Sequence, residues 1–155
     1  MIDNAESVVR VLFPNKILRG KVMGGAFSLR AQRAEEYISV FRYAGLTFKN
    51  DILTLDKGRN LDCAKMHVAD IRAIHFEEND NIAKCDVVET GNIEKTSHAG
   101  ITVFINGQQL VGGHESEIEL REGYGDSLDA LVLATQHRLA VLAQKGLTQV
   151  NALIM

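Results

Sequence analysis

The chain has 155 residues, of which 46% are hydrophobic and 24% are charged, with 17 basic and 20 acidic side chains. This balance is typical of globular domains and excludes a disordered chain, which has fewer apolar residues and a larger net charge. No apolar run approaches the roughly 18 residues that cross a bilayer, and the acidic start of the chain is unlike a signal peptide. We therefore expect a single domain over residues 1–155, a cytoplasmic location and no membrane partner.

Basic residues concentrate in the segment 10–49, which holds eight bases and two acids. The bases are Arg10, Lys16, Arg19, Lys21, Arg30, Arg33, Arg42 and Lys49, and the acids are Glu35 and Glu36. Such an imbalance indicates either an anionic partner for this segment or packing of the segment beside the acidic remainder of the chain. Both interpretations stay open at this stage, and internal pairing is favoured.

The first predicted element is a short helix that ends before Pro14. Asp3 and Glu6 have the spacing of a capping box, in which each side chain accepts a hydrogen bond from an unpaired backbone N–H at a helix start. Apolar residues then recur at helical spacing at Ala5, Val8, Val9 and Leu12. After three glycines between positions 20 and 25, a strand is expected to begin near Ala26.

A strand is predicted over residues 37–43, where side chains at alternating positions point to opposite faces. One face carries Tyr37, Ser39, Phe41 and Tyr43. Because this face is rich in aromatic residues, we expect it to be the buried one.

The segment 61–75 fits a helix better than a strand, because apolar positions recur every three or four residues. These positions are Leu61, Ala64, Val68, Ile71 and His75. Asn60 or Asp62 can cap the start of such a helix. The strand alternative stays open.

The strongest local signal is a β-hairpin around Asn106-Gly107. Residues 101–105 and 108–111 are its strands, because Asn-Gly tolerates the positive φ angles of a type I′ turn. The β-branched run 84–89 before the hairpin and the alternating run 117–121 after it predict two further strands.

A long helix is predicted from Asp126 or Ser127, which can cap its start, to Gly146, which can end it. Its inward stripe consists of Leu128, Leu131, Val132, Thr135, Leu139 and Leu142. Leu133 and Val141 extend the apolar surface beyond that stripe. We therefore expect a homo-oligomer whose interface covers them.

Together these elements predict an α+β fold with a mixed or mostly antiparallel sheet of about four to six strands. The N-terminal helix, the middle helix over residues 61–75 and the long C-terminal helix are expected to pack on one face of the sheet. No repeat or linker divides the chain.

Two segments carry a family resemblance, AFSLRAQRAEEYISVFR over Ala26–Arg42 and SHAGI over Ser97–Ile101. They are similar to a pattern in small uncharacterised bacterial proteins, in which an Ala-Phe pair precedes a Ser-Val strand and a His-Ala-x-Ile segment follows. The resemblance implies a bacterial cytosolic protein in which Ser39 and His98 are the positions of interest. It implies no mechanism.

His98 is the first candidate catalytic residue, because Ser97 and Gly100 are small enough to let a ligand approach the imidazole. Imidazole transfers protons near neutral pH, but a single histidine before a strand equally serves as a local hydrogen-bonding group. Ser39 is the second candidate, although no GxSxG elbow surrounds it.

No metal site or cofactor is predicted. Asp62, Cys63, His67 and Asp70 would share a face of the predicted middle helix, yet they lack a recognisable third ligand beside the pair Cys63 and His67. Cys63 and Cys85 have no CxxC spacing. We expect two reduced, partly buried thiols rather than a disulfide or a zinc site.

Arg19, Lys21, Arg30 and Arg33 are the candidate residues for an anionic ligand, because they belong to the basic segment. The loop over residues 20–25 lacks the GxxxxGK[ST] order of a phosphate-binding loop, so a plain turn is expected there.

The leading functional hypothesis is a non-enzymatic binding or interaction domain, because no catalytic motifs converge. One alternative is a small enzyme that acts on an anionic, phosphorylated substrate. The other is a nucleic-acid-binding domain that uses the basic segment 10–49, with Tyr37, Phe41 and Tyr43 as a stacking platform.

Overall fold

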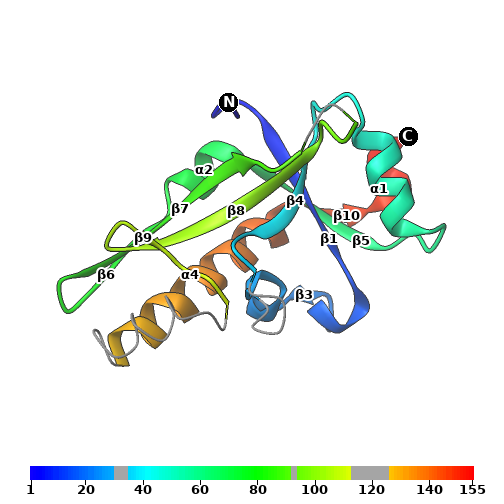
Figure 1. The fold of residues 1–155 in the computed structure, drawn as a ribbon. Helices are drawn as coiled ribbons and strands as arrows, with labels where there is room; N and C mark the ends of the chain where they lie inside the picture. Colours follow the sequence, from blue (N-terminus) through cyan, green and yellow to red (C-terminus); the bar gives the residue numbers. More distant parts are fainter. Residues whose placement is uncertain (30–34, 92–93, 113–125) are drawn as a thin grey trace.

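The computed structural model describes residues 1–29, 35–91, 94–112 and 126–155. Eight strands of these residues form one antiparallel sheet in the order β10-β5-β1-β4-β8-β7-β6, with β9 beside β8 (Figure 1). The strands are β1 (Ser7–Leu12), β4 (Ile38–Arg42), β5 (Asp62–His67), β6 (His75–Glu78), β7 (Asn81–Glu89), β8 (His98–Ile105), β9 (Gln108–Gln109) and β10 (Leu147–Gln149). The α+β class with a mostly antiparallel sheet is confirmed, and the sheet has more strands than predicted.

Helices cover both faces of the sheet, whereas the sequence predicted helices on one face. They are α1 (Phe48–Asp56), α2 (Val68–Arg72), α4 (Asp126–Lys145) and α5 (Val150–Ile154). The long α4 lies across one face, and α1 packs beside α5 on the other face, at the end formed by β1 and β5 (Figure 1). No helix in the described part of the chain is long and apolar enough to cross a membrane.

Strand β1 explains why both faces are covered. Its side chains alternate between the faces, so Val8 and Leu12 enter the core under α4 while Val9 and Val11 enter the core under α1 and α5. All four side chains are at most 5% exposed. A strand that is apolar on both faces is stable only when both faces are removed from water.

The N-terminal segment forms β1 and not the predicted helix. The predicted capping pair does bond, because the Asp3 N–H donates to Glu6 Oε2 (2.9 Å) and the Ala5 N–H donates to Asp3 Oδ1 (2.8 Å). These bonds close a turn, after which β1 pairs with β4 on one side and β5 on the other. Ladder bonds on both sides, together with a β-branched sequence, outweigh the local helix signal.

The segment 61–75 is mainly extended, which corrects the helix predicted there. β5 takes its first part, the five-residue α2 follows, and β6 begins at His75. Cys63 and Ala64 face opposite cores, so adjacent positions are both apolar and imitate a helical spacing. Two further corrections concern Gly24–Phe27, a 3-10 helix (η2) where a strand was expected to begin, and α1, which was not predicted.

Several predicted elements match the structure. The hairpin turn forms at Asn106-Gly107, where φ is 50° and 82°, and β7 extends the predicted strand 84–89. Helix α4 ends directly before Gly146. Four members of its predicted inward stripe are buried, namely Leu131, Thr135, Leu139 and Leu142. The Leu128 side chain and the predicted strand 117–121 lie outside the described residues.

Strand β4 matches the strand predicted over residues 37–43, but its main buried face is the opposite one. Ile38 and Val40 are 2% and 1% exposed and belong to the core under α4. On the aromatic face Ser39 is exposed and Tyr43 is 39% exposed, while Phe41 is buried in the core under α1. The prediction failed because it relied on the aromatic residues to mark the buried face, whereas the aliphatic Ile38 and Val40 form the face that packs under α4.

The junction between α4 and β10 gives a first test, the substitution Gly146→Ala. A Cβ here would overlap the Lys65 carbonyl oxygen of β5, and the Gly146 carbonyl accepts a hydrogen bond from the Lys65 N–H (3.0 Å). The Lys65 carbonyl can move away only if the backbone of β5 shifts, so we expect the free energy of unfolding in urea to fall by about 1–3 kcal/mol. Gly25→Ala is the control, since a Cβ there meets nothing within 4 Å. Equal stability of the two variants would contradict the close approach.

Candidate functional site

A two-stranded hairpin lies against the C-terminal half of α4. β2 (Ile17–Leu18) pairs with β3 (Lys21–Val22), and Arg19 and Gly20 form the turn with φ of 52° and 78°. Positive φ at both central residues is the type I′ geometry, and glycine adopts it without steric cost. The hairpin therefore presents Arg19 and Lys21 next to each other at its tip.

Gln144 of α4 fastens this hairpin to the helix. Its Oε1 accepts a hydrogen bond from the Val22 N–H (2.8 Å), and its Nε2 donates to the Gly20 carbonyl (3.1 Å). One amide side chain thus satisfies a donor and an acceptor of the hairpin backbone. The two bonds fix the distance between the hairpin and α4.

Between the hairpin and α4 lies a cavity of about 760 Å³, which we call the basic groove. Its described lining is Arg19, Gly20, Lys21, Val22, His137, Ala140, Val141, Gln144 and Lys145. The floor is apolar, the rim carries cations, and none of the described lining residues is acidic. A cavity of several hundred Å³ with an apolar floor and a few polar groups is typical of a small-ligand site.

The cations of the basic groove are not neutralised within the described chain. The side chains of Arg19, Lys21 and Lys145 form no ion pair or hydrogen bond with any described residue. Lys145 also stands in the last turn of α4, where a positive charge offsets the negative end of the helix dipole. The groove therefore concentrates positive charge that is open to a ligand.

Two bases of the segment 10–49, Arg42 and Arg10, are bonded within the protein. Arg42 donates to Glu6 Oε1 and to Glu89 Oε1, both at 2.9 Å. The hydrogen bond from Arg42 holds the pKa of Glu6 below its ordinary value although burial opposes this, and the pKa of Arg42 is raised in turn. Arg10 donates to the carbonyls of Ala26 (2.9 Å) and Ser39 (2.7 Å). Arg10 and Arg42 therefore have structural roles, whereas Arg19 and Lys21 are open to a ligand.

On the other side of the hairpin turn lies a second cavity of about 370 Å³, which we call the turn hollow. It shares Arg19 and Gly20 with the basic groove, and its remaining lining is Leu12, Pro14, Ile17, Arg59, Asn60, Leu61 and Asp62. The Arg59 guanidinium lies 5.5 Å from the centroid of the Phe13 ring, and its Nε donates to the Asp56 carbonyl (3.1 Å). Unlike the groove, this hollow contains a carboxylate.

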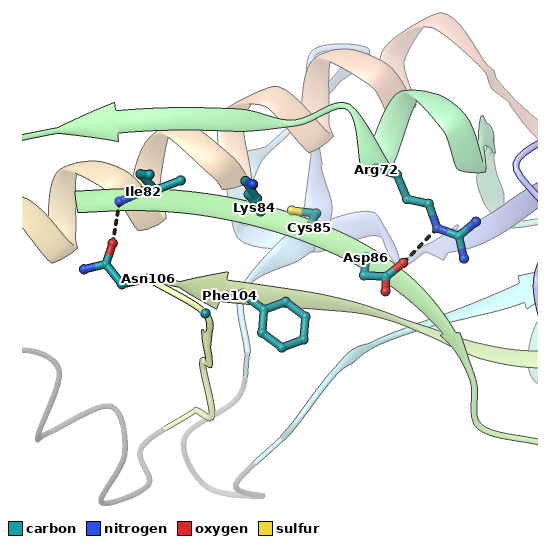
Figure 2. Close-up of a pocket in the computed structure, with 8 residues that line it drawn as sticks. Arg72, Ile82, Lys84, Cys85, Asp86, Phe104 and Asn106 are labelled. Carbon is teal, nitrogen blue, oxygen red and sulfur yellow. Dashed lines mark hydrogen bonds and ion pairs between the residues drawn. The ribbon is translucent and has the colours of Figure 1, made fainter. Parts of the chain in front are cut away.

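A third cavity, of about 500 Å³, lies on the surface of β7 and β8. Figure 2 shows Arg72 reaching Asp86 there, with Lys84 and Phe104 beside them. Arg72 already donates to Asp86 Oδ1 (2.8 Å) and to the Val87 carbonyl (3.0 Å). Because its guanidinium is bound internally, this cavity offers less free positive charge than the basic groove.

His98 stands beside Asp51, but the arrangement is not that of a nucleophilic triad. Asp51 Oδ2 accepts hydrogen bonds from Ser97 Oγ and from Thr47 Oγ1, both at 2.6 Å, while His98 Nε2 is 3.8 Å away. Ser97 is fully buried and points its hydroxyl at the carboxylate and not at the imidazole. These contacts join the start of α1 to the start of β8 and have no exposed nucleophile.

Ser39 and His98 are not part of the described lining of the basic groove. Ser39 is exposed on β4 opposite Gly100, and no hydrogen bond joins it to His98 in the described chain. The His98 ring packs edge-on against Phe41, with centroids 5.2 Å apart. Arg30 and Arg33 lie outside the described residues. Of the four predicted anion ligands, the structure brings Arg19 and Lys21 together.

The cysteines are free and buried. Burial raises the pKa of Cys63 to about 11 and that of Cys85 to about 12. Such thiols stay protonated at neutral pH and are poor nucleophiles and poor metal ligands. Within the described ranges, no three His, Cys, Asp or Glu side chains gather in a way that could hold a metal ion.

Sequence reasoning missed the residues that α4 contributes to the groove. His137, Val141, Gln144 and Lys145 recur at intervals of four, three and one, which places them on one helical face. That spacing could have shown that the polar residues His137, Gln144 and Lys145 lie on one helical face beside Val141. It could not have shown that the hairpin of β2 and β3 covers this face.

Comparison with known protein families, with curated proteins and with solved structures finds no match to this chain.

The contacts of Asp51 predict a pH-dependent contribution to stability. Burial raises the pKa of Asp51, but hydrogen bonds from Ser97 and Thr47 and the charge of His98 outweigh it, so the pKa lies below the ordinary 3.8. A carboxyl with a lowered native pKa stabilises the fold above its unfolded pKa and loses that contribution as pH falls through the native value. We expect Asp51→Asn to lower the free energy of unfolding at pH 7 by about 1–3 kcal/mol.

Urea titrations between pH 7 and pH 3 measure this effect. The gap between wild type and Asp51→Asn should be constant above about pH 5 and should narrow below it. Asp80→Asn, at an exposed turn position, should change stability by less than about 0.5 kcal/mol. A gap that does not change with pH would show that the Asp51 charge contributes nothing.

Proposed function

We propose that this chain is a non-enzymatic binding domain that holds a small anionic ligand in the basic groove. The observation that carries the proposal is the convergence of Arg19, Lys21 and Lys145 on one cavity whose described lining has no acid. Two of these cations come from the hairpin and one from α4, and Gln144 holds the two elements together.

Electrostatics favour an anion in this position. Like charges around one cavity repel each other, and an anionic ligand converts that repulsion into charge-assisted hydrogen bonds. The apolar floor of Val22, Ala140 and Val141 lowers the local dielectric constant and strengthens those bonds. Guanidinium and ammonium groups together suit phosphate or carboxylate oxygens.

Binding fits the groove better than catalysis does. Its described lining supplies hydrogen-bond donors and positive charge, and His137 is the one described side chain there that could move a proton near neutral pH. General acid-base catalysis needs the proton-transferring group to be held in a fixed orientation, and no hydrogen bond from a described residue orients the His137 ring. The alternative of a small enzyme with His98 as its catalytic residue draws no support from this groove, because His98 is not part of its described lining.

Self-association through α4 remains part of the proposal. Leu133 is 64% exposed, as an interface residue would be in the separate chain, whereas Val141 is half-buried in the basic groove. Light scattering at high micromolar concentration should give a mass above 17.1 kDa, and Leu133→Glu should return it to that of one chain. A wild-type chain that stays monomeric would remove this part.

The resemblance to small bacterial proteins is the basis for proposing a bacterial, cytoplasmic setting.

Isothermal titration calorimetry with sodium pyrophosphate tests the binding function. We expect Lys21→Ala and Lys145→Ala each to weaken binding roughly fivefold to tenfold, because each removes one charge-assisted contact. Binding should also weaken as NaCl is raised from 20 to about 300 mM, since salt screens exposed charges.

Two matched controls remove a lysine elsewhere. Lys49→Ala changes an exposed lysine of α1, and Lys84→Ala changes the lysine of the cavity on β7 and β8. Neither should alter affinity by more than about twofold. If Lys84→Ala abolishes binding and the groove variants do not, the ligand belongs in the other cavity and the proposal fails. Absence of binding at low salt would also end it.

A further inference from the structure

The basic groove and the turn hollow are neighbours, separated by the turn of the β2–β3 hairpin. Both contain Arg19 and Gly20 in their lining. Gly20 has no side chain, and the space that a Cβ would occupy there is open, with no atom within 4 Å. A ligand that lies over Gly20 would therefore contact the lining of both cavities.

The two cavities differ in the chemistry that they offer. All charged residues in the described lining of the groove are cationic, whereas the turn hollow combines Arg19 and Arg59 with the Asp62 carboxylate, which accepts hydrogen bonds and donates none. Arg59 already donates to the backbone carbonyls of Asp56 and Leu55, so its guanidinium is largely bound within the protein. Asp62 is half-buried, and its side chain forms no ion pair or hydrogen bond with any described residue. A half-buried carboxylate without a bonded partner is costly, and donor groups of a ligand would satisfy it.

Asn60 supplies the complementary group in the turn hollow. Its Oδ1 accepts a hydrogen bond from the Asn151 N–H (2.9 Å), which leaves the amide nitrogen as the donor for a ligand. Asp56 holds the segment in place, because its carboxylate accepts hydrogen bonds from the N–H groups of Asn60 (3.1 Å) and Leu61 (2.7 Å). An acceptor and a donor side by side on a fixed backbone are suited to hydroxyl groups, which act as both.

We propose that the ligand is a phosphorylated small molecule with a hydroxyl-bearing ring, its phosphate in the basic groove and its hydroxyls on Asp62 and Asn60. This rests on the proposed function of the groove and specifies its ligand. A carboxylate repels phosphate, so Asp62 sets the direction in which the molecule lies. Sugar phosphates and nucleotides share this chemistry, and a ribose 5-phosphate group contains both parts.

Calorimetry at low salt with four probes tests the ligand class. The probes are inorganic phosphate, propyl phosphate, ribose 5-phosphate and adenosine monophosphate. We expect ribose 5-phosphate to bind roughly tenfold tighter than the first two, which lack ring hydroxyls. Adenosine monophosphate that binds tighter than ribose 5-phosphate would assign the site to nucleotides, and equal or weaker binding would assign it to sugar phosphates. Either result supports the class.

Asp62→Asn links the preference to the turn hollow. It should weaken ribose 5-phosphate binding roughly fivefold to tenfold while leaving inorganic phosphate within about twofold, because phosphate does not reach Asp62. Asp80→Asn is the control for the loss of one acidic charge, and thermal unfolding checks that both variants fold. If Asp62→Asn does not fold, the comparison of propyl phosphate with ribose 5-phosphate on the wild-type chain decides the question.

The outcomes separate this inference from the proposed function. If all four probes bind with equal affinity and Lys21→Ala weakens the binding of each, the anion-binding function of the groove is supported and the preference for a hydroxyl-bearing ligand is contradicted. If no probe binds and the lysine variants change nothing, the groove itself is wrong. A single-stranded oligothymidylate that binds more than about a hundredfold tighter than adenosine monophosphate would assign the surface to nucleic acid and overturn the small-molecule class.

Discussion

The two hydrogen bonds between Gln144 and the β2–β3 hairpin are the contacts on which the proposed site depends. The hairpin strands are two residues long each, and a ribbon of that size has no independent stability. Gln144 bonds the hairpin backbone at Gly20 and Val22 and so holds it over α4. Ile17 and Val22 of the hairpin also pack against the core, and together these contacts place Arg19 and Lys21 beside the end of α4.

The sequence predicted those parts of the fold whose signals are local. The turn at Asn106-Gly107 and the helix that ends at Gly146 have residues whose backbone preferences determine the structure by themselves. The segments Ser7–Leu12 and Asp62–His67 were predicted as helical because both of their faces are apolar. Where helices cover both faces of a sheet, a strand is apolar on both faces, and its sequence lacks the alternation of polar and apolar residues that identifies a strand. Only the tertiary structure then shows whether such a segment is a strand or a helix.

The hairpin residues of the candidate site could be predicted from the sequence, whereas the residues that α4 contributes could not. Arg19 and Lys21 belong to a segment with excess positive charge, and the absence of acids within nine residues on either side of their turn is visible in the sequence. Internal partners for Arg42 come from Glu6 and Glu89, which lie 36 and 47 residues away, so charge balance along the chain could not separate paired from open bases. The contribution of Lys145 depends on the contact between α4 and the hairpin, two elements that are more than a hundred residues apart in the sequence.

An NMR titration would show whether the basic groove binds an anion between the hairpin and the end of α4. Pyrophosphate would be added to ¹⁵N-labelled protein at low salt, and the amide shifts would be followed. We expect the largest shifts at residues of the groove, namely Gly20, Lys21, Val22, Gln144 and Lys145. Shifts centred on His98 and Asp51, or spread evenly over the surface lysines, would contradict it.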